Sequence, residues 1–354
     1  MDPITHVLLG GTTAQAAARN GEARAAALAG GVAAVIPDLD MFIPAGGDSL
    51  SALLLHRNFS HSIVFMPLGA LIAAGLVWLL LRRSTGFGRV YLWSLLGIVV
   101  HAPLDALNAY GTTLLWPFSD LRVAWPIMPV VEIVFTTGLL IAAGVAFYVN
   151  RPRAARFGLV FACAWLAVAA LQYERAKSAV VDLAQERGER IERMLVQPSL
   201  GNLWLWGSRY ETADGHYQLD ALYLGPTGTT RVYPGDRPRA FRLDHEPGIP
   251  ADSRVARDLE RFRWFADDWL IRDPQSLQVI GDARYVSPPH RARPLWGVSY
   301  DPDDFDRAME FEHFRNVVDR DWPAFLLMIA GRPVDMDDTG ATLWRPQQPE
   351  PIDE

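Results

Sequence analysis

Cysteine and charge are both scarce in this sequence. One of its 354 residues is cysteine, Cys163, and charged side chains make up 21% of the chain. A single cysteine excludes an internal disulfide framework and a thiolate metal site. The net charge of −7 gives no support to nucleic-acid binding, which favours a basic surface. Hydrophobic residues account for 50% of the chain and the mean hydropathy is +0.07, values that argue against a purely soluble single domain.

The few charges are unevenly distributed. Up to Tyr173 the chain has ten arginines and eight acidic residues, whereas from Glu174 onward 23 basic residues oppose 32 acidic ones. We therefore predict an all-α polytopic membrane helix bundle over residues 1–173, followed by a small soluble α+β domain. The second half is expected to divide into an amphipathic linker helix over residues 174–197, the α+β domain over residues 198–335 and a loosely ordered tail over residues 336–354.

Long uncharged runs predict the membrane segments. The runs that approach the roughly 20 apolar residues needed to cross a hydrocarbon core of about 30 Å are residues 62–81, 90–108, 126–150 and 157–173. Two earlier stretches, residues 4–18 and 25–36, are shorter and rich in Ala and Gly, which let helices pack closely. We expect this pair to be tilted or re-entrant, which makes six segments in all.

Arginines in the short loops predict the orientation. Three loops on one side of the six segments carry Arg19, Arg24, Arg82, Arg83, Arg89, Arg151, Arg153 and Arg156. Because cytoplasmic loops are enriched in basic residues, this side is predicted to face the cytoplasm. The N-terminus and the whole second half then lie outside, together with the loops that contain Arg57 and Arg122.

Alternating patterns predict short strands in the second half. Residues 203–211 and 216–224 are expected to pair around the turn-forming dipeptide Asp214-Gly215. Residues 252–265 predict a helix, and further strands are expected at residues 269–272, 283–287 and 295–300. No recognisable catalytic constellation occurs in this half of the sequence.

Eight ionisable side chains fall within or beside the apolar segments, where a charge costs roughly 2.5 to 3.5 kcal/mol on insertion scales. They are His6, Asp38, Asp40, His56, His61, His101, Asp105 and Glu132. The orientation inferred from arginines alone places all eight toward the outer side. His101 and Asp105 are four residues apart, so both lie on one helix face within about 6 Å. A hydrogen-bonded pair would explain those two, but eight such residues at one depth predict a metal site.

Nitrogen and carboxylate ligands without thiolate favour zinc, with manganese or iron as alternatives. Their number is sufficient for two ions, and two ions about 4 Å apart suit displacement at phosphorus. The predicted ligands are His6, Asp38, Asp40, His56, His61, His101 and Asp105, with one of the two neighbouring aspartates outside the ligand set. Glu132 or the spare aspartate, such as Asp40, would handle the proton, although Glu132 could instead make a polar contact inside the bundle. Arg57 and Arg122 are candidate phosphate contacts, with snorkelling toward headgroups as the alternative.

The motifs that carry these residues resemble one family. Over about residues 1–135 their order and spacing are similar to those of the YdjM-like family of inner-membrane metal-dependent hydrolases. That family is in turn distantly similar to zinc-dependent phospholipase C and related single-strand nucleases, whose zinc-binding His and Asp, four residues apart, match His101 and Asp105. The downstream histidines of those enzymes have no counterpart here, so a third metal is not expected. The matching motifs are Met1-Asp2-Pro3-Ile4-Thr5-His6, Pro37-Asp38-Leu39-Asp40, His56-Arg57, Ser60-His61-Ser62, His101 with Asp105, Tyr110-Gly111-Thr112 and Trp116-Pro117-Phe118-Ser119.

These observations predict a membrane-embedded metal-dependent hydrolase. The resemblance implies a multi-pass protein of the bacterial inner membrane, and the predicted orientation puts the second half on the periplasmic or extracellular side. A site at headgroup depth favours a phosphoester bond of a lipid or lipid-linked substrate at the outer leaflet. Two alternatives remain open, a metal-ion transporter and a non-catalytic membrane scaffold that presents the second half to an unidentified protein partner. A transporter predicts ligands near the bilayer midplane and similarity between halves, and the sequence offers neither.

Overall fold

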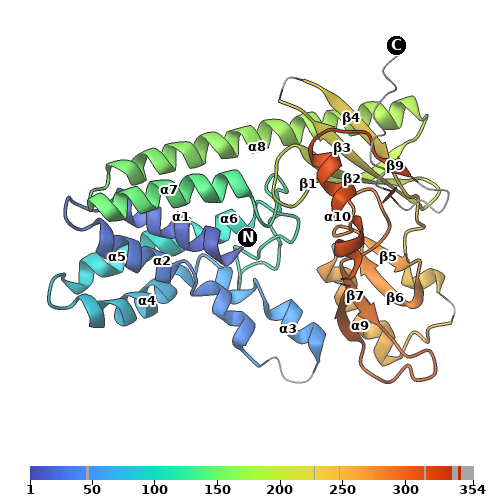
Figure 1. Ribbon diagram of the computed structural model, residues 1–354. Coiled ribbons are helices and arrows are strands. Elements are labelled where there is room, and N and C mark those ends of the chain that lie inside the picture. Colours follow the sequence, from blue (N-terminus) through green and yellow to red (C-terminus); the bar gives the residue numbers. More distant parts are fainter. Residues whose placement is uncertain (45–47, 227, 247, 315, 337–341, 344–354) are drawn as a thin grey trace, which may run out of the picture.

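Helices make up the first half of the chain, and antiparallel sheets dominate the second (Figure 1). The computed structural model describes residues 1–44, 48–226, 228–246, 248–314, 316–336 and 342–343. The helices and helical turns of the first half are α1 (Pro3–Ala16), α2 (Ala23–Ala33), η1 (Pro37–Phe42), α3 (Ser49–Leu55), η2 (Phe59–His61), α4 (Met66–Leu81), α5 (Phe87–Val99), α6 (His101–Asp105), α7 (Ile133–Val149) and α8 (Arg153–Glu186).

Small residues bring α1, α2 and α5 into close contact. A Cβ atom added at Gly97 would lie 2.2 Å from the carbonyl oxygen of Gly30, and one at Gly10 would lie 2.8 Å from the same oxygen. Only glycine fits where three backbones approach this closely. The prediction that residues 4–18 and 25–36 use small residues to pack helices together is confirmed.

The outer faces of the bundle are apolar and exposed. Large hydrophobic side chains on α4, α7 and α8 are open to the surroundings, for example Leu80, Ile141 and Phe157. Among the described residues, two helical stretches are long and apolar enough to cross a membrane, Phe87–Asp105 and Arg153–Glu186. A third span is possible if Ser49–His61 and Met66–Leu81, bent by 87°, count as one broken span.

The structure therefore corrects the expected all-α polytopic bundle of six segments to two or three candidate spans. The remaining apolar helices are shorter, with 11 residues in α2 and 17 in α7. At a rise of about 1.5 Å per residue, such helices fall short of a hydrocarbon core of about 30 Å.

Helix α8 connects the two halves without a break. Its 34 residues correspond to a length of about 51 Å, so that it extends well beyond a bilayer core. Figure 1 shows it running from the bundle to the first sheet. The linker helix predicted over residues 174–197 is thus the second part of α8 as far as Glu186. It ends at Glu186, and strand β1 (Ile191–Pro198) follows.

Two four-stranded antiparallel sheets form the second half, each with its strands in sequence order. The first contains β1 (Ile191–Pro198), β2 (Leu205–Thr212), β3 (Tyr217–Leu224) and β4 (Thr230–Pro234). The second contains β5 (Leu270–Asp273), β6 (Ser276–Asp282), β7 (Trp296–Ser299) and β8 (Glu310–His313). The other elements are η3 (Leu243–His245), α9 (Arg254–Phe265), α10 (Asn316–Ile329) and the short pair β9 (Asp335–Met336) and β10 (Thr342–Leu343).

Several elements of this half match the sequence predictions. The hairpin of β2 and β3 turns at Gly215, whose φ of 77° is the left-handed conformation that glycine adopts most easily. Helix α9 lies where residues 252–265 predicted it. The strand expected at residues 283–287 is wrong, because only Val286 forms an isolated bridge there. Most of the tail predicted over residues 336–354 lies outside the described residues.

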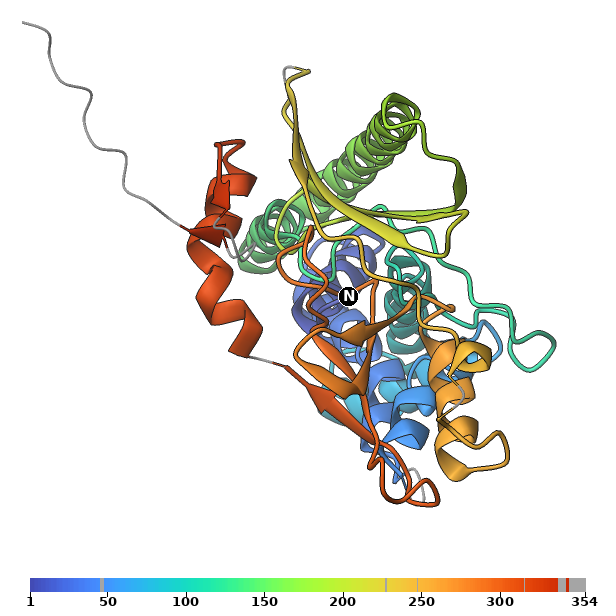
Figure 2. The ribbon, with the colours of Figure 1, turned by 90° about the vertical axis from the view of Figure 1, so that its right-hand side faces the viewer.

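The second half lies against one end of the helix bundle, the end where α3 and the N-terminus are found. Figure 2, with the sheets in front, shows the bundle and the N-terminus behind them. Polar contacts hold the two halves together. Arg254 and Arg261 of α9 bind Asp48, the N-cap of α3, at 2.6 and 3.0 Å, and Arg284 donates to the carbonyl oxygen of Ala109 at 2.9 Å.

Candidate metal centre

Four acidic and imidazole side chains from three segments meet at one point of the bundle. Asp38 lies on η1, just after α2; His61 ends η2; and His101 and Asp105 lie on α6. Pro103 explains why α6 is separate from α5, since proline has no N–H to donate to the carbonyl of Val99. The break lets α6 present His101 and Asp105 to the two turns.

The ligand atoms of these four residues, the metal cluster, all lie within 4.8 Å of one another. The Nε2 atoms of His61 and His101 are 3.0 Å apart. His61 Nε2 is 3.4 Å from an Asp38 oxygen and 3.3 Å from an Asp105 oxygen, and His101 Nε2 is 3.5 Å from each. All but Asp38 are buried. The prediction that these distant segments share one pocket is confirmed.

The hydrogen bonds around the metal cluster leave its centre rich in lone pairs. His101 Nδ1 lies 2.6 Å from the Ala34 carbonyl, an acceptor only, so this nitrogen donates and in a neutral ring Nε2 carries the lone pair. His61 Nδ1 faces the Ser60 hydroxyl at 3.0 Å and Asp40 at 3.5 Å, which gives it the same tautomer. In the described part of the chain, Asp105 Oδ2 has no hydrogen-bond donor.

A divalent metal ion fits this arrangement. Two imidazole lone pairs facing each other beside two carboxylates repel one another unless a cation lies between them. Ligands at about 2.0 to 2.2 Å from a tetrahedral ion lie roughly 3.3 to 3.6 Å from each other. The His–His and His–Asp separations here are 3.0 to 3.5 Å, and all four ligand atoms lie within 4.8 Å. The donation from His101 to a backbone carbonyl is also the usual way of fixing a metal-binding imidazole.

Three other predicted ligands surround the metal cluster without joining it. His6 stacks on His101 with ring centroids 3.8 Å apart, and its Nε2 is 3.2 Å from Asp105. Asp40 accepts hydrogen bonds from the Ser60 hydroxyl, the Arg57 backbone and His56 Nδ1, the last at 2.7 Å. These bonds turn Asp40 and His56 toward each other. Among the described residues, one group of four predicted ligands lies close enough together to share an ion, and a second ion with the other ligands stays a prediction.

Arg57 lies at the edge of the metal cluster. Its guanidinium is 3.2 Å from an Asp105 oxygen, donates to Asn108 Oδ1 at 3.1 Å and lies 5.0 Å from the centre of the Tyr110 ring. The backbone of Arg57 has a φ of 64°, a strained conformation that its N–H bond to Asp40 helps to hold. The arginine predicted to contact phosphate is therefore beside the predicted ligands.

Arg122 and Glu132 have different surroundings. Arg122 donates to the carbonyl of Phe265 at 2.7 Å, at the end of α9, and lies over the Trp264 ring. Burial, together with the nearby Arg284, lowers the pKa of Arg122 to about 10. Arg122 thus joins the two halves, a role that neither sequence interpretation included. Glu132 is the N-cap of α7 and accepts from the Trp165 indole at 3.0 Å, the bundle contact considered as its alternative.

Arg57, which contacts Asp105 of the metal cluster, also lines a cavity of about 270 Å³. The other lining residues include His56, Tyr110 and Thr113 of the first half, and Trp264 and Phe265 of α9. Tyr110 belongs to one of the motifs that carry the family resemblance, so the sequence already singled it out. Nothing in the sequence connected α9 with this site, because the contact joins residues more than 140 positions apart.

Comparison with known proteins agrees with the predicted family. The family model described as YdjM inner membrane protein matches residues 1–176. The first half of the chain places it in the YdjM family. The uncharacterized protein YfhP of Bacillus subtilis is 33% identical over 88 residues, which cover 25% of this chain and 26% of YfhP. The chain thus matches about a quarter of the length of that relative. No solved structure matches the chain.

Membership of this family and the apolar helices identify a membrane protein. Four residues of the YdjM-like motifs, Asp38, His61, His101 and Asp105, form the metal cluster. The likeness to zinc-dependent phospholipase C stays a prediction from the sequence.

Proposed function

We propose that this YdjM-family protein is a metal-dependent hydrolase that acts on a phosphoester bond at the membrane surface. The observation that supports it best is the metal cluster, in which four ligand atoms from three distant segments lie within 4.8 Å. Its polar groups cost free energy in the interior of an apolar bundle, and a function that requires a metal explains why they are there. We propose one ion, and the donor set favours zinc, with manganese or iron as alternatives.

The ion would supply Lewis acidity, which lowers the pKa of a bound water and neutralises negative charge on a phosphoester. The chain's own residues then have separate tasks. Arg57 is positioned to bind a phosphate oxygen, since its guanidinium lies between the metal cluster and the adjoining cavity. If Arg57 contacts the substrate, this role explains why an arginine occupies a position with a strained backbone.

His56 is the residue that we propose for proton transfer. Its Nδ1 lies 2.7 Å from Asp40, and the side chain lines the cavity beside Arg57. A carboxylate behind an imidazole fixes the ring and stabilises its protonated form, which suits general acid–base catalysis at Nε2. Glu132, the group suggested by the sequence, has its carboxylate engaged in capping α7.

A lipid or lipid-linked substrate is favoured by the position of the site. The bundle carries an exposed apolar surface, and the cavity beside the metal cluster lies where the second half meets the bundle. The aromatic rings of Tyr110, Trp264 and Phe265 line this cavity together with Arg57 and His56. We place this site at the outer leaflet of the bacterial inner membrane, in line with the distribution of arginines.

Metal content and activity together test the proposal. The full chain is purified in detergent, depleted with a chelator and reloaded with zinc, manganese or iron. We expect close to one ion per chain by mass spectrometry, and metal-dependent release of phosphate or a phosphorylated headgroup from a panel of phospholipids and lipid pyrophosphates. His101→Ala combined with Asp105→Ala should abolish both.

The matched control is His216→Ala combined with Asp214→Ala. This His–Asp pair, with atoms 3.4 Å apart, is exposed on the β2–β3 hairpin and should leave metal content and activity unchanged. Metal content that survives the loss of His101 and Asp105 would contradict the site. Bound metal without hydrolysis of any panel member would contradict the proposed activity while leaving the metal site intact.

A further inference from the structure

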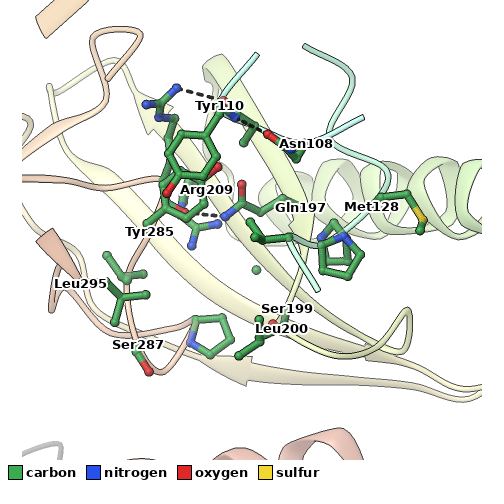
Figure 3. Close-up of a pocket in the computed structure, with 18 of the residues that line it drawn as sticks. Asn108, Tyr110, Met128, Gln197, Ser199, Leu200, Arg209, Tyr285, Ser287 and Leu295 are labelled. Carbon is green, nitrogen blue, oxygen red and sulfur yellow. Dashed lines mark hydrogen bonds between the residues drawn. The ribbon is translucent and has the colours of Figure 1, made fainter. Parts of the chain in front are cut away.

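A second cavity, of about 300 Å³, lies between the bundle and the sheets. Its walls are mostly apolar and come from both halves, including Met128, Leu200, Leu295, Trp322 and Phe325. Figure 3 shows Leu200 and Leu295 toward one end, with Arg209, Asn108 and Gln197 toward the other. Ligand pockets of proteins combine apolar walls with a few polar groups in this way, and this cavity is at the small end of their size range.

Five polar groups of the described part of the chain lack hydrogen-bond partners at this cavity. Among the described residues, no hydrogen bond is made by Arg209 Nη1, Asn108 Nδ2, Tyr285 Oη, Trp296 Nε1 or Ser199 Oγ, and all five residues line the cavity. Three of these groups, those of the arginine, the asparagine and the tryptophan, can only donate. Buried polar atoms are almost always paired, so five of them around one space indicate a ligand rich in acceptors.

Arg209 gives the cavity a positive charge. The side chain is 1% exposed, and in the part of the chain that the structure describes no carboxylate pairs with it; its Nε donates to the carbonyl of Ala283. The neighbouring Arg284, by contrast, is paired with Asp282 at 2.7 Å. Burial lowers the pKa of Arg209 only to about 10, so the guanidinium remains charged at neutral pH. The more distant Asp282, already paired with Arg284, is the carboxylate that acts on Arg209, so a bound anion would stabilise this buried cation.

Gly207 creates the space for this guanidinium. It precedes Arg209 by two residues on β2, so both face the same side of the sheet. A Cβ atom at Gly207 would lie 2.9 Å from Arg209 Nη1 and 3.2 Å from Pro289. Because Gly207 has no side chain, the Arg209 guanidinium has room at the cavity. This arrangement is expected of a binding site.

We propose that this cavity binds an anionic amphiphile, with its phosphate held by Arg209 and Asn108 and its hydrocarbon part against Leu200, Leu295 and Phe325. This site is separate from the metal cluster. The two are connected through Arg57, which is hydrogen-bonded to Asn108 and paired with Asp105. Lipid phosphates have the required combination of acceptor oxygens and an apolar chain.

Hexyl phosphate is a soluble probe for this chemistry. Binding to the full chain in a neutral detergent is measured by calorimetry, with hexanol and inorganic phosphate as comparison ligands. We expect one hexyl phosphate per chain, bound at least tenfold more tightly than either comparison ligand. Equal binding of hexanol would contradict an anion site, and equal binding of inorganic phosphate would show that a free anion, not an amphiphile, is the ligand.

Arg209→Gln should weaken binding of hexyl phosphate roughly 10- to 100-fold, the loss expected for a hydrogen bond to a charged group. Arg209→Lys should restore part of the affinity because the charge is kept. The matched control, Arg237→Gln, changes an exposed arginine of the same half and should have no effect. Unchanged binding in Arg209→Gln would overturn the proposal.

Three further measurements separate binding from folding and from the metal cluster. Arg209→Gln removes an uncompensated buried charge, so the variant without ligand should melt at the same temperature as the parent chain or higher; a purely structural arginine would lower it. Asn108→Leu, which removes the second donor, should also weaken binding. Chelator-treated protein should bind hexyl phosphate with unchanged affinity, and loss of binding on chelation would assign the probe to the metal cluster instead.

Discussion

The two halves of this protein bury different kinds of residues. The bundle packs through alanine and glycine, with Ala14, Ala26 and Ala29 fully buried, whereas the second half buries large aromatic side chains such as Trp206 and Tyr217. In lipid the hydrophobic effect does not drive helices together, so they associate through close backbone contact. In water, burial of large apolar surface provides the driving force.

Buried charges also differ between the halves. In the second half they are mostly ion pairs, such as Arg187 with Asp220 and Arg284 with Asp282. In the metal cluster two carboxylates face two imidazoles, and one oxygen of Asp105 also contacts the N-terminal ammonium of Met1, His6 and the Arg57 guanidinium. The ion pairs of the second half stabilise the fold, whereas the four ligand atoms of the metal cluster lie close enough together to share a metal ion.

The largest expected effect tests this difference directly. Asp282→Asn leaves Arg284 as an uncompensated charge in the interior and should lower the free energy of unfolding by about 3 to 5 kcal/mol. Denaturant titration followed by tryptophan fluorescence measures it. The exposed pair of Arg307 with Glu310 supplies the control, since Glu310→Gln should cost less than about 0.5 kcal/mol. In chelated protein, Asp38→Asn should lower the free energy of unfolding by no more than about 1 kcal/mol. A loss as large as that of Asp282→Asn would contradict the difference between the ion pairs of the second half and the metal cluster.

Close packing of the bundle is tested by Gly97→Ala. The added Cβ would clash with the Gly30 carbonyl, a backbone atom that cannot move aside, so we expect a loss of about 3 kcal/mol or more. Gly144→Ala on α7 is the control, because nothing lies within 4 Å of a Cβ there. Thermal unfolding in detergent compares the two variants. Equal melting temperatures would contradict the tight crossing of α1, α2 and α5.

Asp40→Asn tests whether the hydrogen bonds that Asp40 accepts orient the ligands of the metal cluster. Asp40 holds the segment from His56 to His61 without being a ligand in this geometry, so its loss should weaken metal binding about 10- to 100-fold. Competition with a chelating dye measures the affinity. Asp120→Asn, an exposed change in the loop after Asp105, is the control. A lower melting temperature with unchanged metal affinity would show a structural role alone.

The smallest expected effect concerns His290 of the second half. Burial, and to a lesser degree Arg291, lowers its pKa to about 3, whereas the unfolded chain has the ordinary value of about 6.5. The unfolded state therefore binds more protons below about pH 6.5, and the stability present above that pH falls as the pH is lowered. Between about pH 7.5 and pH 5.5 the expected loss is about 1.4 kcal/mol.

Denaturant titrations at the two pH values measure this loss, and His290→Leu provides the reference. The difference between the parent chain and His290→Leu isolates the histidine from the carboxylates that titrate in the same range. An identical pH dependence in both chains would show that His290 does not remain neutral in the folded state.

Much of the candidate site could be predicted from the sequence, because its side chains are ionisable and the segments around them are apolar. Ionisable residues in apolar segments are conspicuous, and the helical spacing of His101 and Asp105 alone places both on one face. Short loops between helices then restrict where the segment Pro37–Asp40 and His61 can lie. The segment lengths were harder to predict, since hydropathy does not show that Pro103 breaks a helix or that α7 begins only at Ile133.

By itself, the sequence determined that the chain has a membrane half with small-residue helix packing, that its ionisable residues gather at one end, and that the β2–β3 hairpin turns at Gly215. These properties depend on local spacing and composition. Only the tertiary structure decided which of the seven predicted ligands meet, that Arg122 binds the end of α9, and that Arg209 faces a cavity shared by both halves. Such contacts join residues far apart in the chain, and their geometry is set by packing, which no local pattern records.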